Sequence, residues 1–177
     1  VAVRGDRVTA PLPERKRTRL KGYDYSRAGV YFLTLCAAER RCLFAQVRAG
    51  GGVPDAPRVI LTKYGMAVKE RLEEMDRVYG YVALLKYVIM PNHVHILLQV
   101  TDGPSRTPAP AERDCANQTI PAFVSALKRM TNRICGVPLW QRGYHDHIVR
   151  NDDDYLRIWQ YIDNNPSRWA EDKYFTQ

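Results

Sequence analysis

The stretch "VALLKYVIMPNHVHILLQV" at residues 82–100 joins two apolar, β-branched runs through the tripeptide Met-Pro-Asn at 90–92. Such runs are typical of β-strands, and a proline between them lacks the amide donor that a ladder needs. We therefore predict strands over 82–90 and 93–100, joined by a tight turn or by a break in one longer strand.

The second run carries two of the chain's four histidines, His93 and His95. Alternate residues of a strand face the same side, so both imidazoles point one way while Val94 and Ile96 point the other. At ~3.3 Å per residue the two side chains start about 6–7 Å apart, close enough to converge on one metal ion. The pair fits either a metal site with a third ligand from elsewhere, or two half-buried histidines bonded to carbonyl groups.

The flanking sequence adds a further strand and two helices to the predicted strand pair. Residues 29–37 have strand composition, and 48–57 form a flexible turn or hairpin tip. Apolar residues recur every three or four positions over 62–78 and 119–135, which predicts amphipathic helices. A Pro-rich connector covers 101–114. These elements predict an α+β sandwich, an antiparallel sheet with helices packed on one face.

A third helix is predicted over 152–164, where Asn151 can cap the start and Asn165–Pro166 ends the helix. Tyr161 and Asn165 are four residues apart, so they share one helix face. A phenol can act as a nucleophile toward phosphorus, and an amide oxygen can bind a hard cation. The alternative is that Tyr161 packs against a neighbour and Asn165 caps the helix.

A second histidine pair, His145 and His147, lies in the strand-like segment "YHDHIVR" at 144–150. These residues are either further metal ligands or part of a polar sheet face. The first pair is the stronger candidate, because an unpartnered polar group is costly in an apolar strand.

A basic arm occupies residues 1–21, where seven Lys or Arg stand against two acids and supply +5 of the net charge of +8. Clustered cations favour a polyanionic partner, since each cation beside a phosphate releases counterions. The same composition fits a solvated, disordered terminus. The remaining residues, 22–177, are long enough for one domain with a buried core.

The composition predicts a cytoplasmic protein. No apolar stretch follows the arm at the distance of a signal peptide, and Lys86 interrupts the longest hydrophobic run, so no export signal or membrane span is expected. The four cysteines show no metal-ligand spacing, and we expect reduced, mostly buried thiols: Cys36, Cys42, Cys115 and Cys135.

Four separated blocks of the chain resemble the REP-associated tyrosine transposases, of the single-tyrosine HUH transposase family, whose name describes histidine–hydrophobic–histidine. The blocks are "RLKGYDYSRAGVYFLTL" (19–35), "YVIMPNHVHILL" (87–98), "LWQRGYHDHIVR" (139–150) and "YLRIWQYIDNNPSRW" (155–169). They follow the family's order and span nearly the whole chain. The resemblance implies a ferredoxin-like or RRM-like sandwich and a single catalytic domain over 22–177.

The resemblance also implies a role for each motif residue. His93 and His95 match the histidine pair and would bind Mg²⁺ or Mn²⁺. Tyr161 matches the nucleophile and Asn165 the third metal ligand. The implied activity is a single-strand DNA endonuclease and strand transferase that forms a 5′-phosphotyrosine link. That link conserves the energy of the phosphodiester, so no nucleotide cofactor is expected.

The expected partner is single-stranded or hairpin DNA. We expect the protein to act as a monomer rather than a homodimer, and to lie in the cytoplasm, at the nucleoid when it is bound to DNA. Two groups of cations are candidate DNA contacts, one in the arm and one on the second helix: Arg17, Arg19, Lys21, Lys128, Arg129 and Arg133. The chain ends soon after the Asn-Pro segment, which leaves substrate and regulation open.

Two other functions compete with this interpretation. One is a DNA-hairpin-binding protein that has lost its cutting activity, although the intact motif residues argue against that loss. The other is an unrelated metallohydrolase that uses all four histidines with water as its nucleophile.

Overall fold

The computed structural model describes residues 23–48, 57–101 and 118–175. Its main sheet has four antiparallel strands in the order β4-β5-β1-β6. The strands are β1 (Gly29–Cys36), β4 (Val82–Ile89), β5 (His93–Val100) and β6 (His145–Ile148). The predicted strand pair is thus confirmed, and Met90 N donates to His93 O at 2.9 Å to close a tight turn.

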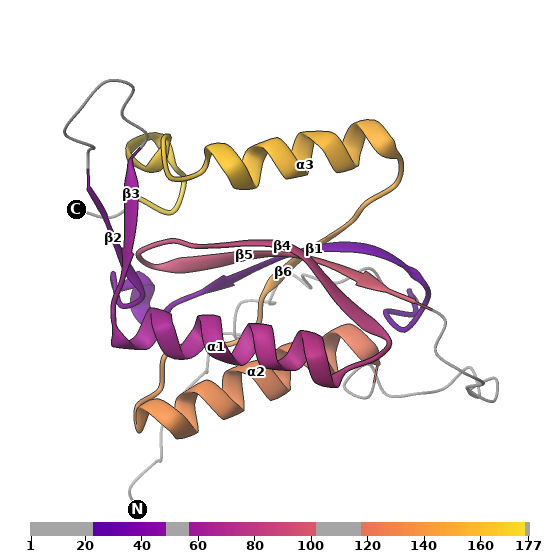
Figure 1. The fold of residues 1–177 in the computed structure, drawn as a ribbon, viewed down its shortest axis with the longest axis horizontal. Helices are drawn as coiled ribbons and strands as arrows, with labels where there is room; N and C mark the ends of the chain where they lie inside the picture. The colour runs from indigo at the N-terminus through magenta and orange to yellow at the C-terminus, as the bar shows by residue number, and fades with distance from the viewer. Residues whose placement is uncertain (1–22, 49–56, 102–117, 176–177) are drawn as a thin grey trace, which may run out of the picture.

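Two helices connect these strands, α1 (Lys63–Val78) and α2 (Thr119–Cys135), and both lie against one face of the sheet (Figure 1). The chain order β1-α1-β4-β5-α2-β6 is the βαββαβ arrangement of the ferredoxin-like fold, which confirms the expected fold class. A third helix, α3 (Asp152–Asn164), lies across the opposite face and adds a third layer to the expected sandwich (Figure 1).

The helix boundaries agree with the sequence prediction to within one residue, because local capping sets them. Thr62 Oγ1 accepts hydrogen bonds from the Tyr64 and Gly65 amides, and Asn151 Oδ1 accepts from Asp154 N. Gly136 ends α2 in the left-handed conformation with φ 69°.

A separate two-stranded ribbon, β2 (Ala45–Arg48) and β3 (Arg58–Leu61), leads into α1. The residues between these strands, 49–56, contain most of the predicted hairpin tip and lie outside the described residues. Gly65 at the start of α1 allows the ribbon to pack closely, since a Cβ there would come within 2.0 Å of the Phe44 carbonyl oxygen.

Several side chains are more exposed than their sequence pattern predicts. Val78 and Ile134 continue the apolar stripes of α1 and α2, yet they are 70% and 55% exposed, because each lies in the last turn of its helix. Cys42 is also exposed, Cys135 is partly exposed and Cys36 is buried, so the expectation of mostly buried thiols is wrong for the described cysteines. Cys115 lies outside the described residues.

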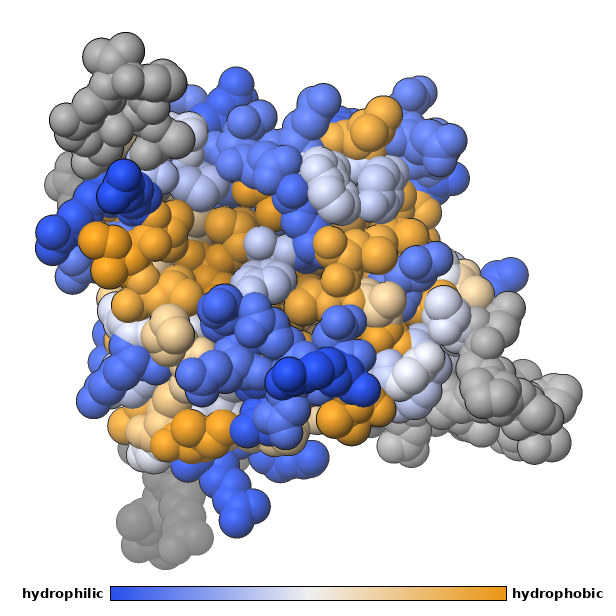
Figure 2. Space-filling model, in the orientation of Figure 1, coloured by the Kyte–Doolittle hydropathy of each residue, from blue (hydrophilic) through white to orange (hydrophobic). Residues whose placement is uncertain are grey.

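The surface follows the layered order of the fold. In the view of Figure 1, Figure 2 shows hydrophilic side chains over α3 and α1, with a band of hydrophobic side chains between them at the level of the sheet. Among the described residues, no helix combines the length and apolar character required to cross a bilayer.

Candidate metal and tyrosine site

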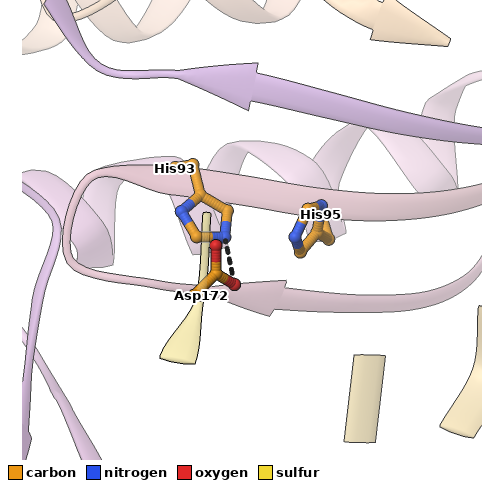
Figure 3. Close-up of side chains that lie close together, drawn as sticks. All are labelled: His93, His95 and Asp172. Atoms are coloured by element: carbon orange, nitrogen blue, oxygen red, sulfur yellow. Dashed lines mark ion pairs between the residues drawn. The ribbon is translucent and has the colours of Figure 1, made fainter. Parts of the chain in front are cut away.

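The alternation of β5 places His93 and His95 on one side of the strand, as predicted, and this side is the face that α3 covers. Val94 and Ile96 point into the core shared with α1 and α2. The two imidazoles are buried, at 0% and 1% exposure, and their ring centroids are 4.5 Å apart. Figure 3 shows both rings on the same side of the strand.

The hydrogen bonds that Asn92 makes determine the tautomer of His93. The Asn92 amide nitrogen donates to Tyr174 O at 2.6 Å and to Arg40 O at 3.2 Å, so its Oδ1 must face His93 Nδ1, which is 3.0 Å away. Nδ1 therefore carries the proton, and the lone pair of His93 lies on Nε2.

His95 is held in a similar way by the neighbouring strand. Its Nδ1 lies 2.8 Å from the Thr34 hydroxyl on β1, which leaves Nε2 directed toward α3. Burial lowers the pKa of His93 to about 4, although the nearby Asp172 carboxylate opposes part of that shift. Burial, and then the neighbouring His93, hold the pKa of His95 well below its ordinary value. Both rings are thus neutral at pH 7, the form that binds a metal.

Asp172 is a member of this cluster that sequence reasoning missed. Its Oδ2 lies 3.9 Å from His93 Nε2 (Figure 3), and the ligand atoms of His93, His95 and Asp172 all lie within 4.8 Å of one another. Asp172 follows the short 3₁₀ turn Trp169–Glu171 that comes after α3. No periodicity in the sequence distinguishes it from the adjacent Glu171.

Asn165, the ligand expected from the sequence, lies beside Asp172. Its Nδ2 donates to Asp172 Oδ2 at 2.8 Å, while its Oδ1 is buried without a hydrogen-bond partner in the described part of the chain. His93 Nε2 is buried and unpartnered in the same sense. Two orphaned acceptors near a buried carboxylate fit a bound cation, because such groups are costly to bury otherwise.

Tyr161 reaches this cluster from α3, on the same helix face as Asn165. Its hydroxyl lies 3.3 Å from His95 Nε2, and its ring packs against His95 and Phe32 with centroid distances of 5.1 and 6.0 Å. The side chain is partly open to solvent, at 38% exposure. Burial, followed by the negative charge of Asp172, raises the pKa of Tyr161 to about 12, so the phenol is protonated at pH 7.

A cavity of about 780 Å³ opens between α3 and the sheet and includes His95, Tyr161, Asn165 and Asp172 in its lining. Arg157, Arg168 and Lys173 also line it, which gives the space around the phenol a cationic rim. The tyrosine is therefore accessible to an anionic substrate.

The other predicted residues lie elsewhere. Lys128, Arg129 and Arg133 are on α2, across the sheet from Tyr161, and Lys128 Nζ donates to the carbonyls of Gln141 and Gly143. The arm residues Arg17, Arg19 and Lys21 fall outside the described residues.

His145 and His147 face the same side as the first pair, but β1 separates β6 from β5. Two strand spacings amount to about 9–10 Å, too far for the four histidines to share one ion. Among the described residues, the group that could hold a metal ion contains His93, His95 and Asp172.

Comparisons with known proteins place the chain in a family. The family model described as "Transposase IS200 like" matches residues 57–165, more than half of the chain. An uncharacterized protein of Haemophilus influenzae is 30% identical over 181 residues, covering 94% of this chain and 96% of the relative. The chain therefore belongs to the IS200-like transposase family, which confirms the transposase membership expected from its motifs.

A solved structure has the same fold. The structure of a REP-associated tyrosine transposase bound to a REP hairpin matches with a TM-score of 0.56 at 19% identity, over 89% of this chain and 74% of that one. The two proteins thus share the overall fold.

Proposed function

We propose that this protein is a metal-dependent single-strand DNA endonuclease and strand transferase that works through a 5′-phosphotyrosine intermediate. The observation that carries the proposal is the position of the Tyr161 hydroxyl, 3.3 Å from His95 Nε2 and beside the His93–His95–Asp172 cluster. A phenol next to a ligand set for a cation is the arrangement that nucleophilic attack on a phosphodiester requires.

The proposed ligands are His93 Nε2, His95 Nε2 and an oxygen of Asp172, with Asn165 Oδ1 available beside them. Two imidazoles with oxygen donors suit Mn²⁺ well, and Mg²⁺ also accepts the oxygen ligands. A divalent cation bound there would act as a Lewis acid toward the phosphate oxygens.

Tyr161 supplies the nucleophile. Its hydroxyl oxygen forms a bond to phosphorus, the bond from phosphorus to the 3′-oxygen breaks, and the leaving strand takes up a proton as a free 3′-hydroxyl. Because the pKa of Tyr161 is raised to about 12, the phenol must lose its proton as the phosphate is attacked. The resulting phosphotyrosine can pass its phosphate to another 3′-hydroxyl, and no nucleotide cofactor is consumed.

The proposed substrate is hairpin DNA with a single-stranded flank. The structural relative was solved with a REP hairpin, and this chain shares its fold. We propose phosphate contacts for the exposed Arg129 and Arg133, for Lys128, and for Arg17, Arg19 and Lys21 of the arm. Since Tyr161 and His95 meet within one chain, a monomer can contain the complete site. We propose that this monomer acts in the cytoplasm.

A gel assay for the covalent intermediate tests the proposal. The protein is incubated with Mn²⁺ and end-labelled hairpin DNA that carries a single-stranded flank, and a protein–DNA band is sought under denaturing conditions. We expect the band to require Mn²⁺ and to be absent in Tyr161→Phe and His95→Ala. Tyr155→Phe is the matched control, because Tyr155 lies on the same helix but packs against Trp159.

The alternatives predict different results. Cleavage without a covalent adduct would favour a hydrolase that uses water, and hairpin binding without cleavage would favour a protein that has lost its activity. A band that persists in Tyr161→Phe would refute the assignment of the nucleophile.

A further inference from the structure

A second cavity, of about 460 Å³, adjoins the tyrosine site on the side of β6. It shares part of its lining with the first cavity, namely Phe32, Thr34, His147 and Lys173. The two cavities therefore meet along β1 and β6 and form one groove, which runs from α3 past Tyr161 to Arg40 and Tyr174.

Strand register explains the floor of this groove. Phe32 is paired with His147, and Thr34 with His145, so these side chains point to the same face of β1 and β6. β6 is the edge strand of the four-stranded sheet, so the groove opens at that edge to solvent. The His147 side chain is 42% exposed where the two cavities meet.

Cations lie along the groove on both sides of that junction. Arg157 and Arg168 line the first cavity, Arg40 lines the second, and Lys173 lines both. Of the acids, Asp172 belongs to the proposed ion site, Asp146 accepts the Tyr25 hydroxyl at 2.6 Å, and Glu171 lies in the first cavity. The cationic side chains are thus the ones positioned to meet a phosphate chain.

Hydrogen bonds hold the junction residue in a defined orientation. His147 Nε2 lies 2.7 Å from Asp154 Oδ2, and Arg157 Nη2 lies 2.5 Å from Asp154 Oδ1. The hydrogen bond from His147, then those from Arg157 and the Arg150 amide, lower the pKa of Asp154 to about 2, so it remains a carboxylate. The ring of His147 is fixed through Nε2, and its other edge is left for the groove.

The length of the groove indicates which part of a substrate it holds. Asp154 and Tyr161 are seven residues apart on α3, which corresponds to about 10 Å along the helix axis. A stacked strand carries one phosphate per ~3.4 Å, so this distance spans up to about three nucleotides. Side chains near His147 are thus positioned to contact nucleotides adjacent to the scissile phosphate and not the scissile phosphate itself.

We propose that this groove binds the single-stranded nucleotides that flank the scissile phosphate. Arg157 and Arg40 contact backbone phosphates, and His147 contacts the nucleotide between them. These are positioning residues, and the identity of the bound strand rests on the proposed function. Their loss weakens binding of the strand without removing the nucleophile.

Binding of plain single-stranded DNA tests the groove without any cleavage. The probe is a labelled oligothymidylate of roughly 12 nucleotides, and every variant is made in a Tyr161→Phe background so that no covalent adduct forms. Arg157→Gln and Arg40→Gln are each expected to weaken binding about three- to tenfold and to lower the salt dependence by ~0.7 per lost phosphate contact.

Arg77→Gln is the matched control, because Arg77 is an exposed arginine of α1, on the helical layer across the sheet. Its affinity should stay within about twofold of the background protein. Equal losses in all three variants, or no loss in Arg157→Gln and Arg40→Gln, would overturn the proposal. Circular dichroism of each variant confirms that the fold is kept.

Photocrosslinking gives an independent readout at the junction. With 5-iododeoxyuridine in the probe, crosslinked peptides should include His147 or its neighbours on β6, and crosslinks confined to α1 and α2 would contradict the groove. Failure of the proposed chemistry can be distinguished from failure of the groove. In the first case the covalent band is missing in the hairpin assay, but the variants still weaken oligothymidylate binding as expected.

Discussion

The two faces of the four-stranded sheet differ in what they bury. Toward α1 and α2, one continuous apolar core includes Leu33, Val94 and Leu127, none of which has any exposed surface. Toward α3, the buried apolar cluster consists of Leu97, Ile158 and Ile162 among the described residues. The remaining buried positions on that side include the polar side chains His93, His95 and Asn165.

The difference indicates that the apolar face mainly stabilises the fold, whereas the polar face carries the candidate site. Apolar burial contributes most of the free energy of folding, whereas buried polar groups cost free energy unless they are paired or bound to a ligand. A face that carries several buried polar groups beside a small apolar cluster therefore contributes little to stability, and these polar groups form the candidate site. The α1–α2 face supplies the rigidity that keeps these groups in place.

The largest expected effect is a loss of free energy of unfolding when the apolar face is truncated. Leu127→Ala in α2 should lower the free energy of unfolding by about 3–5 kcal/mol, because the fully enclosed site cannot collapse around the cavity. Ile158→Ala in α3 should cost about 2 kcal/mol, since its small cluster lies beside an open cavity and can relax. Urea titrations measure both values, and equal costs would show that the faces contribute alike.

The next prediction concerns the metal and Asn92. If Mn²⁺ is present at ~100 times its dissociation constant, it should stabilise the wild-type protein by about 2.7 kcal/mol. Asn92→Ala removes the group that orients His93 and should weaken metal affinity about 10–100-fold, so about 1.3–2.3 kcal/mol of this stabilisation is lost. The readout is the difference in unfolding free energy with and without Mn²⁺, in which the folding cost of the substitution cancels.

Asn132→Ala provides the control for Asn92→Ala. Asn132 Oδ1 accepts a hydrogen bond from Leu139 N, and it lies on α2, on the other face of the sheet. Its loss should lower stability and leave the Mn²⁺ difference unchanged. An Mn²⁺ difference that survives in Asn92→Ala would mean that His93 does not depend on Asn92 for its orientation.

Much of the site follows from local patterns in the sequence. Strand alternation correctly placed His93 and His95 together, and helical periodicity correctly placed Tyr161 and Asn165 on one face. That the two pairs would meet was implied by the family resemblance and not by periodicity. β5 is apolar on both faces, with Val94 on one side and Leu97 on the other, so its pattern did not say which helix covers which face.

Asp172 lay beyond the reach of such patterns. It stands seven residues after Asn165 in an irregular segment, and the 3₁₀ turn Trp169–Glu171 decides that it, and not Glu171, faces His93. The strands β2 and β3 were not predicted by themselves, although the hairpin tip expected at 48–57 fits their antiparallel pairing.

The pH dependence of stability should also come from the α3 face. In the metal-free protein, burial lowers the pKa of His93 from 6.5 to about 4. The unfolded chain therefore binds more protons between these values, and stability should fall as the pH drops from about 6.5 to 4. We expect a loss of about 3 kcal/mol over this window.

His93→Gln should reduce this dependence and leave the share that comes from the buried His95. His145→Gln, an exposed histidine of the same face, should retain it in full. Denaturant titrations at several pH values in the presence of a chelator provide the measurement. An unchanged slope in His93→Gln would assign the pH dependence to other groups.

The smallest effect on stability should come from the ion pair that attaches α3 to the edge strand β4. Lys86 Nζ lies 2.7 Å from Asp163 Oδ1 and 3.9 Å from the centroid of the Trp159 ring, and these two partners flank Tyr161 in the sequence. Lys86→Met keeps the apolar stem and removes both interactions, at a cost of about 1 kcal/mol or less. Because that contact orients the helix, the rate of covalent adduct formation should nevertheless fall several-fold.

Lys69→Met is the control. It breaks a comparable pair on α1, with Glu73 at 3.6 Å, on the opposite layer of the fold. It should change stability by a similar small amount and leave the adduct rate unaltered, so equal rates in the two variants would show that α3 is positioned by its apolar cluster alone.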